Sequence, residues 1–382
     1  MQNYSGIIIG ILLLFTALLP AQPAHWQGQL SGWNFFDKDA LSQSTFGFRY
    51  LPALSLGGSV NDRYRLDSEI SLNFFGSGSY EFPDDAVRES DIKAYRLWLR
   101  FSGERFELRA GLQKINFGAA MILRPLMWFD RIDPRDPLAV TNGVYALLGR
   151  YYFLNNANIW AWGLYGNDEA KGWEFIPSDP KQPEYGGRIQ LPLGPGEIAA
   201  TFHHRQADLS ALTLPGFIIR DPLVPENRFA LDGKWDLEIG LWFETTLLHQ
   251  EGGILPYLYR HFTTIGADYT FPLGNGLHML GEHLQLTQGD TPFGREEVRH
   301  FSAIWGDYSF GLLDRLQAIV YYDWDSNQFS RFASWSRSYD HWQFYLNLFW
   351  NPKQSSTALF PGSLTENINR GTGLQVMLVL NH

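Results

Sequence analysis

Cysteine is absent from this chain of 382 residues. The protein therefore has no disulfide framework, no Cys-ligated zinc or iron–sulfur centre, no cysteine nucleophile and no lipid-bearing N-terminal cysteine. We expect neither a metal nor another cofactor.

Charged residues are also scarce. Asp, Glu, Lys and Arg make up only 18% of the chain, and 40 acidic residues against 30 basic ones leave a formal net charge of −10. Binding to phosphate backbones needs clustered basic residues, so we expect no nucleic-acid partner.

Long hydrophobic runs are missing except at the N-terminus, where residues 7–19 are apolar and Pro and small residues follow. This run is shorter than the roughly 20 residues that a transmembrane helix needs, and its length is that of a secretory signal peptide. We therefore predict a cleaved signal peptide over residues 1–24 and one domain over residues 25–382. A membrane helix is the alternative for the run itself.

Aromatic residues and glycine are abundant instead, with 14 Trp, 18 Tyr, 28 Phe and 37 Gly at a mean hydropathy of −0.21. Apolar residues alternate with more polar ones in segments such as 95–101, 106–113, 315–324 and 342–350. A period of two is that of a β-strand. The pattern predicts an all-β wall with one apolar and one polar face, which fits a sandwich or a barrel.

The lengths of the connections separate these two architectures. Tight turns alternate with longer polar connections, of which we identify 76–90, 118–142, 168–183, 206–225, 251–258, 289–296 and 352–370. Short periplasmic turns and longer extracellular loops are typical of transmembrane antiparallel up-and-down β-barrels. We predict 18 strands. Sixteen is the alternative, because 52–63 is long for a periplasmic turn and 325–330 is short for an outer loop.

The C-terminal segment is a further amphipathic strand, in which Leu374, Val376, Leu378 and Leu380 share one face. In outer-membrane proteins the barrel-assembly machinery recognises such a terminal strand, which usually ends in an aromatic residue, whereas this chain ends in His382. We expect the protein in the outer membrane of a Gram-negative bacterium, in contact with lipid and lipopolysaccharide. The number of copies in its assembly is left open.

One stretch carries a family resemblance. Residues 107–118 (ELRAGLQKINFG), with the following LRPLMWFDRIDPRDP and the hairpin 185–204, resemble bacterial outer-membrane β-barrel porins of the substrate-specific, alginate-export type. Arg109, Gln113 and Gly118 are the matching positions. The resemblance implies an 18-strand channel for passive or substrate-selective diffusion of small polar or anionic solutes.

The face opposite the apolar one would then line the pore. We predict these pore-lining residues: Arg96, Arg100, Glu107, Arg109, Gln113, Arg150, Arg188, Arg228, Glu238, Glu244, Glu282 and Asp323. Arginine predominates on the fourth to ninth strands and carboxylates on the eleventh to fifteenth, so the lumen would carry a transverse field that filters solutes. The alternative is that these charges pair with one another within the wall, as Glu107 and Arg109 could.

Residues 119–143 form the longest connection with a distinctive composition, because Trp128 and Phe129 stand among charged residues and three prolines. We predict a constriction loop folded into the pore, with the charges Arg124, Asp130, Arg131, Asp133, Arg135 and Asp136. An outward extracellular loop with self-paired charges is the alternative.

An enzyme is not expected. Ten His are present, but no G-x-S-x-G or H-E-x-x-H motif occurs. Glu282 and His283 are adjacent in sequence, and so are His203 and His204, so each pair faces opposite sides of a strand and cannot form one site. The alternatives to a channel are a structural or adhesive barrel and, less favoured, a barrel lipase or protease.

Overall fold

The computed structural model describes residues 24–38, 43–81, 87–211, 222–252, 256–352 and 371–382. Eighteen strands and one short 3₁₀ turn, η1 (Leu209–Ala211), make up this part of the chain. The strands are β1 (His25–Asp37), β2 (Gln43–Ser59), β3 (Arg65–Glu81), β4 (Val87–Ser102), β5 (Phe106–Gln113), β6 (Val144–Tyr152), β7 (Asn158–Leu164), β8 (Glu184–Leu193), β9 (Gly196–Asp208), β10 (Leu223–Asp236), β11 (Gly240–Gln250), β12 (Tyr259–Phe271), β13 (Leu277–Gly289), β14 (Glu297–Ser309), β15 (Asp314–Asp323), β16 (Gln328–Ser338), β17 (Trp342–Trp350) and β18 (Thr372–Asn381).

The strands form one closed antiparallel barrel. Each strand pairs with its neighbours in sequence, and β1 also pairs with β18, in a register that sets Gln29 opposite Asn381 and Asp37 opposite Gly373. Closure leaves no sheet edge, so the backbone groups of every strand find partners within the wall, as a structure in lipid requires. The predicted all-β, 18-strand up-and-down barrel is confirmed, and the sixteen-strand alternative is wrong.

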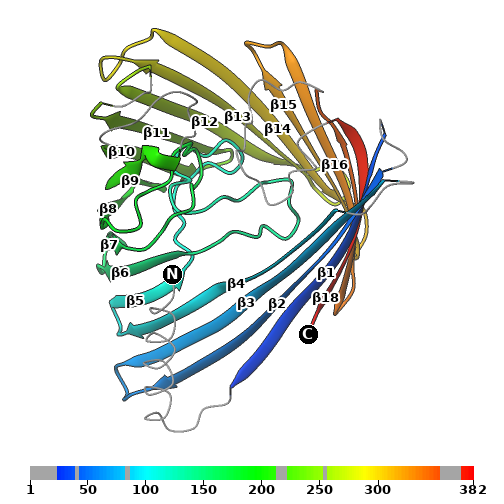
Figure 1. Ribbon diagram of the computed structural model, residues 1–382, viewed down its shortest axis with the longest axis horizontal. Coiled ribbons are helices and arrows are strands. Elements are labelled where there is room, and N and C mark those ends of the chain that lie inside the picture. The colour runs from blue at the N-terminus through cyan, green and yellow to red at the C-terminus, as the bar shows by residue number, and fades with distance from the viewer. Residues whose placement is uncertain (1–23, 39–42, 82–86, 212–221, 253–255, 353–370) are drawn as a thin grey trace.

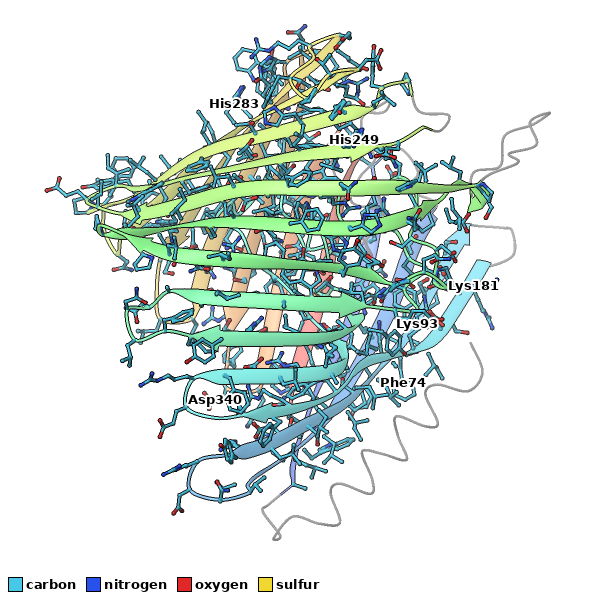
Figure 2. The ribbon with its side chains drawn as sticks, turned by 90° about the vertical axis from the view of Figure 1, so that its left-hand side faces the viewer. Phe74, Lys93, Lys181, His249, His283 and Asp340 are labelled. Atoms are coloured by element: carbon cyan, nitrogen blue, oxygen red, sulfur yellow. The ribbon has the colours of Figure 1, made fainter. Side chains whose placement is uncertain are left out.

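Connections differ between the two ends of the barrel. At one end the strands join through turns such as 103–105, 194–195 and 339–341, whereas the other end carries the loops 114–143 and 165–183. Figure 2 shows Asp340 at the first of these ends and Lys93 and Lys181 at the second. We call them the short-turn end and the long-loop end.

Three boundaries differ from the sequence prediction, because strand pairing continues into segments that looked like connections. β2 extends through most of 52–63, so the turn is only 60–64, and β3 and β4 extend far into 76–90. The connection between β15 and β16 is indeed short, at 324–327. The predicted signal peptide lies almost wholly outside the described residues and stays a prediction.

The outer face of the barrel is largely apolar. Leu108, Leu147, Phe229, Ile304 and Leu378 are all exposed, each on the side of its strand that points away from the lumen. Residues of the opposite parity point into the barrel, and many are buried there, such as Glu244 on β11, Thr264 on β12 and Glu282 on β13. An apolar exterior around a polar interior is the pattern of a barrel in lipid. Among the described residues, no helix is long and apolar enough to cross a membrane.

Candidate functional site

The lumen contains a long inward loop. After β5 the chain enters the barrel and crosses to the opposite wall before returning to β6, as the cyan segment in the middle of Figure 1 shows. Most of its side chains are buried, including Ile115, Leu123 and Trp128. We call residues 114–143 the lumen loop.

Two wall carboxylates hold the lumen loop by its backbone. Glu282 on β13 accepts hydrogen bonds from the amides of Met121 (2.7 Å), Ile122 (3.0 Å) and Leu123 (2.6 Å). Glu244 on β11 accepts hydrogen bonds from the amides of Ala120 (2.7 Å) and Leu126 (3.1 Å). Thr264 on β12 donates its hydroxyl to the Leu123 carbonyl at 2.7 Å. Hydrogen bonds to a charged group contribute about 1.5–3 kcal/mol each, so the three amide contacts with Glu282 alone fix this part of the loop firmly.

Apolar contacts complete the anchorage on both sides of the lumen. Ile122 and Leu123 lie in one cluster with wall residues of β1 and of β11 to β17, including Phe349. Phe117 and Phe129 lie in a second cluster with residues of β6 and β7, including Trp162. The lumen loop is therefore packed against two opposite parts of the wall.

Two ion pairs lie within the lumen loop. Arg124 donates to Asp130 at 3.2 Å, and Arg135 contacts both oxygens of Asp133 at 2.9 and 2.7 Å. The Asp136 carboxylate accepts from the amides of Leu138 and Val140, and the Arg131 amide donates to the Thr141 hydroxyl. The sequence left two interpretations open: a loop folded into the barrel and an outward loop with self-paired charges. The structure shows a loop that lies inside the barrel and contains two internal ion pairs.

Burial shifts the titration of the acidic groups in this loop. It raises the pKa of the Asp130 carboxyl despite the nearby Arg124, and it raises the pKa of the Asp136 carboxyl despite two amide donors. Both shifts follow from the desolvation of a charged carboxylate.

A second loop, 165–183 between β7 and β8, also folds inward. Its Glu174 is buried and contacts Arg228 at 2.6 Å and Arg205 at 3.3 Å, while Lys171 contacts Glu184 of β8 at 3.2 Å. Burial would raise the pKa of the Glu174 carboxyl, but the two guanidinium groups outweigh burial and lower it. The sequence pattern predicted only a polar connection over 168–183. The apolar Trp173 and Ile176 within it were the signal that this segment packs inward.

The two inward loops touch each other. The Gly172 amide donates to the Asp130 carbonyl at 3.1 Å, and the Trp173 indole donates to the Arg124 carbonyl at 2.8 Å. Gly172 has a φ of +48° and lies against the carbonyl of Met127. A side chain there would collide with that backbone, so glycine is required for the close approach.

Part of the wall near the short-turn end carries a basic cluster. Arg109 contacts Glu107 at 2.9 Å, and Arg100 and Arg150 each reach the same carboxylate at 3.7 Å. Arg100 also pairs with Asp67 at 2.7 Å, and Asp67 in turn pairs with Arg65. Four arginines thus face two carboxylates, so the cluster has an excess of positive charge.

The guanidinium groups of this basic cluster retain unused hydrogen-bonding capacity. The guanidinium of Arg109 lies 4.8 Å from the Trp98 ring centroid and that of Arg150 lies 3.8 Å from the Trp160 ring centroid. The Nε atoms of Arg109 and Arg150 are buried without a hydrogen-bond partner in the described part of the chain. The side chains of Arg100, Arg109 and Arg150 remain partly exposed. The cluster is suited to bind or guide an anion.

Other residues predicted to line the pore form hydrogen bonds or ion pairs with the wall or the inward loops. Arg188 forms a bidentate pair with Asp232 at 2.6 and 2.8 Å. Arg96 donates to the Thr141 carbonyl, and Gln113 donates to the Ala146 carbonyl. Arg228 is buried against Glu174. These side chains point into the barrel, but hydrogen bonds hold them to loops or neighbouring strands.

Four residues that the sequence predicted to line the pore do not line open space in the structure. Glu238 lies in the exposed turn between β10 and β11, because β10 ends before it. Asp323 ends β15 and accepts hydrogen bonds from the turn residues Asp325 and Ser326. Glu244 and Glu282 have the predicted inward parity, but the lumen loop covers them.

The next feature is the arrangement of the histidines and carboxylates inside the barrel, which are possible metal ligands. Within the ranges that the structure describes, no group of three or more His, Asp or Glu residues is arranged to hold a metal ion. The most buried histidine, His203, accepts a hydrogen bond from the Trp162 indole at 3.2 Å and contacts Glu184 at 3.1 Å.

Comparisons with known proteins show the fold. No family model and no curated protein matches the sequence. Among solved structures, a loop-L8 deletion mutant of OmpT, an outer membrane protein of Vibrio cholerae, matches with a TM-score of 0.51 at 10% identity over 94% of this chain and 99% of that one. The trimer form of in-vitro folded OmpT matches with 0.51 at 11% identity over 95% and 99%. OmpT expressed in the outer membrane matches with 0.51 at 10% identity over 95% and 100%.

This chain therefore has the fold of a bacterial outer-membrane β-barrel. The closed wall and its apolar exterior agree with that fold and place the protein in the outer membrane. In bacterial outer-membrane barrels the short turns face the periplasm and the longer loops face outward.

Proposed function

We propose that the protein is a porin-like outer-membrane channel for passive or substrate-selective diffusion of small polar or anionic solutes, and not an enzyme. The observation that carries the proposal is the basic cluster. Arg100, Arg109 and Arg150 all contact Glu107, Arg100 also pairs with Asp67, and the three arginines stay partly exposed inside the barrel. Positive charge on a confined wall raises the local concentration of anions, although the whole chain is acidic.

The lumen loop would supply the constriction. Because Arg124 pairs with Asp130 and Arg135 with Asp133, these four charges of the loop cancel locally. Its contribution to selectivity is therefore steric, and the wall cluster provides the electrostatic part. This division assigns size exclusion to the loop and charge preference to β3 to β6.

Ion selectivity tests the proposal directly. Replacing Arg109 and Arg150 together by Gln should shift the reversal potential in planar bilayers toward cations at low salt, and the shift should shrink as salt rises because screening increases. Glu107→Gln should shift it the opposite way, since it removes the cluster's shared anion. Apolar replacements of the outward residues Leu108 and Tyr151 should leave it unchanged. Unaltered selectivity in the conducting double variant would refute the role of the cluster.

A structural or adhesive barrel is the second candidate. It is favoured by one observation, the filling of the lumen by two loops packed against the wall. A reconstituted, folded barrel that carries no ions at any voltage would support this candidate against the channel.

Export and assembly complete the proposal. Removal of residues 1–24 as a signal peptide would precede insertion by the barrel-assembly machinery among lipid and lipopolysaccharide. Mass spectrometry of the membrane form should find a new N-terminus between residues 22 and 26.

A further inference from the structure

Two histidines of neighbouring strands meet on the outer face of the barrel. His283 lies on β13 and His300 on β14, and His300 shares its outward parity with the exposed Ile304. The Nε2 atom of His283 is 3.2 Å from the Nδ1 atom of His300, and the two rings are stacked with their centroids 5.4 Å apart. Figure 2 shows the position of His283 in this part of the wall. We call these two residues the histidine pair.

The histidine pair lies toward the long-loop end of the wall. The Trp324 amide donates to the His300 carbonyl at 3.1 Å, and Trp324 directly follows the last residue of β15. Trp324 is exposed, and exposed Trp side chains are typical of the boundary between lipid and water. Since β13 and β14 continue past this level into the connection 290–296, dissolved ions can reach the pair.

The separation of the two ring nitrogens fits one bound metal ion. Zn²⁺ lies about 2.0–2.1 Å from imidazole nitrogens in tetrahedral coordination, which sets two such nitrogens about 3.3–3.4 Å apart. The observed 3.2 Å agrees with that separation to within about 0.2 Å. A hydrogen bond between two imidazole rings has a similar length, so the surroundings of the pair distinguish the two uses.

A hydroxyl and an indole fix the orientation of the His283 ring. Its Nδ1 atom lies 2.9 Å from the Ser302 hydroxyl, and the Trp324 indole donates to the same hydroxyl oxygen at 2.9 Å. A hydroxyl oxygen has two lone pairs, so it accepts from both groups when His283 carries its proton on Nδ1. This tautomer directs the Nε2 lone pair toward His300. Histidines that bind metals are held in the same way, through their second ring nitrogen.

The charges around the histidine pair favour a cation. The Asp325 carboxylate accepts a hydrogen bond from the His300 backbone amide at 3.1 Å, so an anionic group lies beside the pair. No outward position of β13 or β14 carries Lys or Arg. A bound cation would therefore meet no cationic side chain on the outer face of its own two strands.

We propose that the histidine pair binds one divalent transition-metal ion of the zinc type. Imidazole nitrogens suit Zn²⁺, Cu²⁺ and Ni²⁺, whereas Ca²⁺ and Mg²⁺ prefer oxygen ligands. Nε2 of His283 and Nδ1 of His300 are the protein ligands. With its proton on Nε2, His300 offers Nδ1 without losing a proton.

The ion has these two protein ligands, because no group of three His, Asp or Glu residues in the described ranges is arranged to hold a metal. Water completes its coordination. Bound there, the ion joins β13 to β14 below the connection 290–296. The site lies outside the lumen and does not depend on the proposed channel.

Zn²⁺ binding to the full chain, folded in detergent, tests this proposal. Calorimetry should find one bound Zn²⁺ that is lost in His283→Gln and in His300→Gln, with only protein that migrates as a folded barrel without heating used. Ser302→Ala should weaken binding about tenfold, because it removes the hydrogen bond that orients His283.

His261→Gln is the matched control, since His261 is an outward histidine on β12 whose Nε2 atom contacts the Thr245 hydroxyl at 2.7 Å. It should bind Zn²⁺ like the wild type. Binding that persists in both His283→Gln and His300→Gln, or that falls equally in His261→Gln, would overturn the proposal, the latter by showing adventitious binding to scattered histidines.

Chemical modification of the wild type provides a second measurement that needs no variant. Diethyl pyrocarbonate modifies accessible imidazole rings, and mass spectrometry locates the modified residues. Zn²⁺ should slow the modification of His283 and His300 several-fold and leave that of His204 and His261 unchanged, and Ca²⁺ should protect none of them. Equal modification of the pair with and without Zn²⁺ would show that it forms only a hydrogen bond and would refute the site.

Discussion

Glu282 and Leu123 meet across the interior of the barrel, with the carboxylate oxygen of Glu282 2.6 Å from the backbone nitrogen of Leu123. Leu123 follows β5 in the chain, whereas Glu282 lies on β13, almost half-way round the 18-strand ring. This contact helps to hold the lumen loop across the interior of the barrel. If the protein is a channel as proposed, the contact should limit the width of the passage.

Removing the carboxylates of Glu282 and Glu244, which hold the lumen loop, should widen the channel. In Glu282→Gln the side-chain NH₂ group faces amide donors that it cannot accept from, and each lost charged hydrogen bond costs about 1.5–3 kcal/mol. We expect a larger single-channel conductance for Glu282→Gln and a larger one still with Glu244→Gln added. Glu297→Gln, on the β14 rim beside Arg299, should leave conductance at the wild-type value. Equal conductance in all variants would mean that the loop does not limit the passage.

Contact between the two inward loops should depend on Gly172. Gly172→Ala adds a collision with the Met127 carbonyl to the cost of a left-handed residue, which is about 1–2 kcal/mol. Gly166→Ala is the matched control, because Gly166 also has a positive φ of +80° but a β-carbon there would meet no other atom within 4 Å.

The measurement is the rate of limited proteolysis in the lumen loop of detergent-folded protein. Gly172→Ala should be cleaved several-fold faster than Gly166→Ala. The same rate in both would show that the loops do not rely on this approach.

Acid should release the second inward loop only well below neutral pH. Because Arg205 and Arg228 lower the pKa of Glu174, its ion pairs stabilise the docked loop above the carboxyl's ordinary pKa of 4.5, and this stabilisation is lost as pH falls through the lowered pKa. Asp130 and Asp136 have raised pKa values, so their protonation first relieves a burial cost and favours docking.

Conductance measured against pH checks this order of events. The wild type should hold a constant conductance from neutral pH to about pH 5 and gain conductance only in stronger acid. Glu174→Gln should already conduct more at neutral pH, because two buried guanidinium groups lose a partner, and its difference from wild type should vanish in acid. An increase in wild-type conductance centred near pH 6 would contradict the assignment of loop release to Glu174.

Charge on the outer face should oppose insertion. Leu147 is exposed midway along β6, and Leu147→Arg would place a cation near the membrane midplane at a cost of about 2–4 kcal/mol. We expect a lower yield of folded barrel in liposomes, read from electrophoretic mobility without heating. Leu147→Phe should fold like the wild type. An equal yield for both variants would place this face away from lipid.

The local alternation of apolar and polar residues was sufficient to predict the wall of the barrel. The two-residue period of segments such as 342–350 predicted both the strand and the face that meets lipid, because successive side chains of a strand point to opposite sides. The strand count followed from connection lengths. The ends of β2, β3 and β4 were misplaced, since strand pairing extends beyond the point where alternation fades.

The interior was decided by tertiary contacts. The sequence alone determined that residues such as Glu107, Glu244 and Glu282 face inward, because parity is a local property. Strand register then placed Arg100 and Arg150 beside Glu107. The crossing of the lumen loop buried Glu244 and Glu282 beneath backbone amides far away in the chain. Hydrogen bonds between distant residues leave no periodic signal, so only the folded barrel distinguishes an accessible charge from one that anchors a loop.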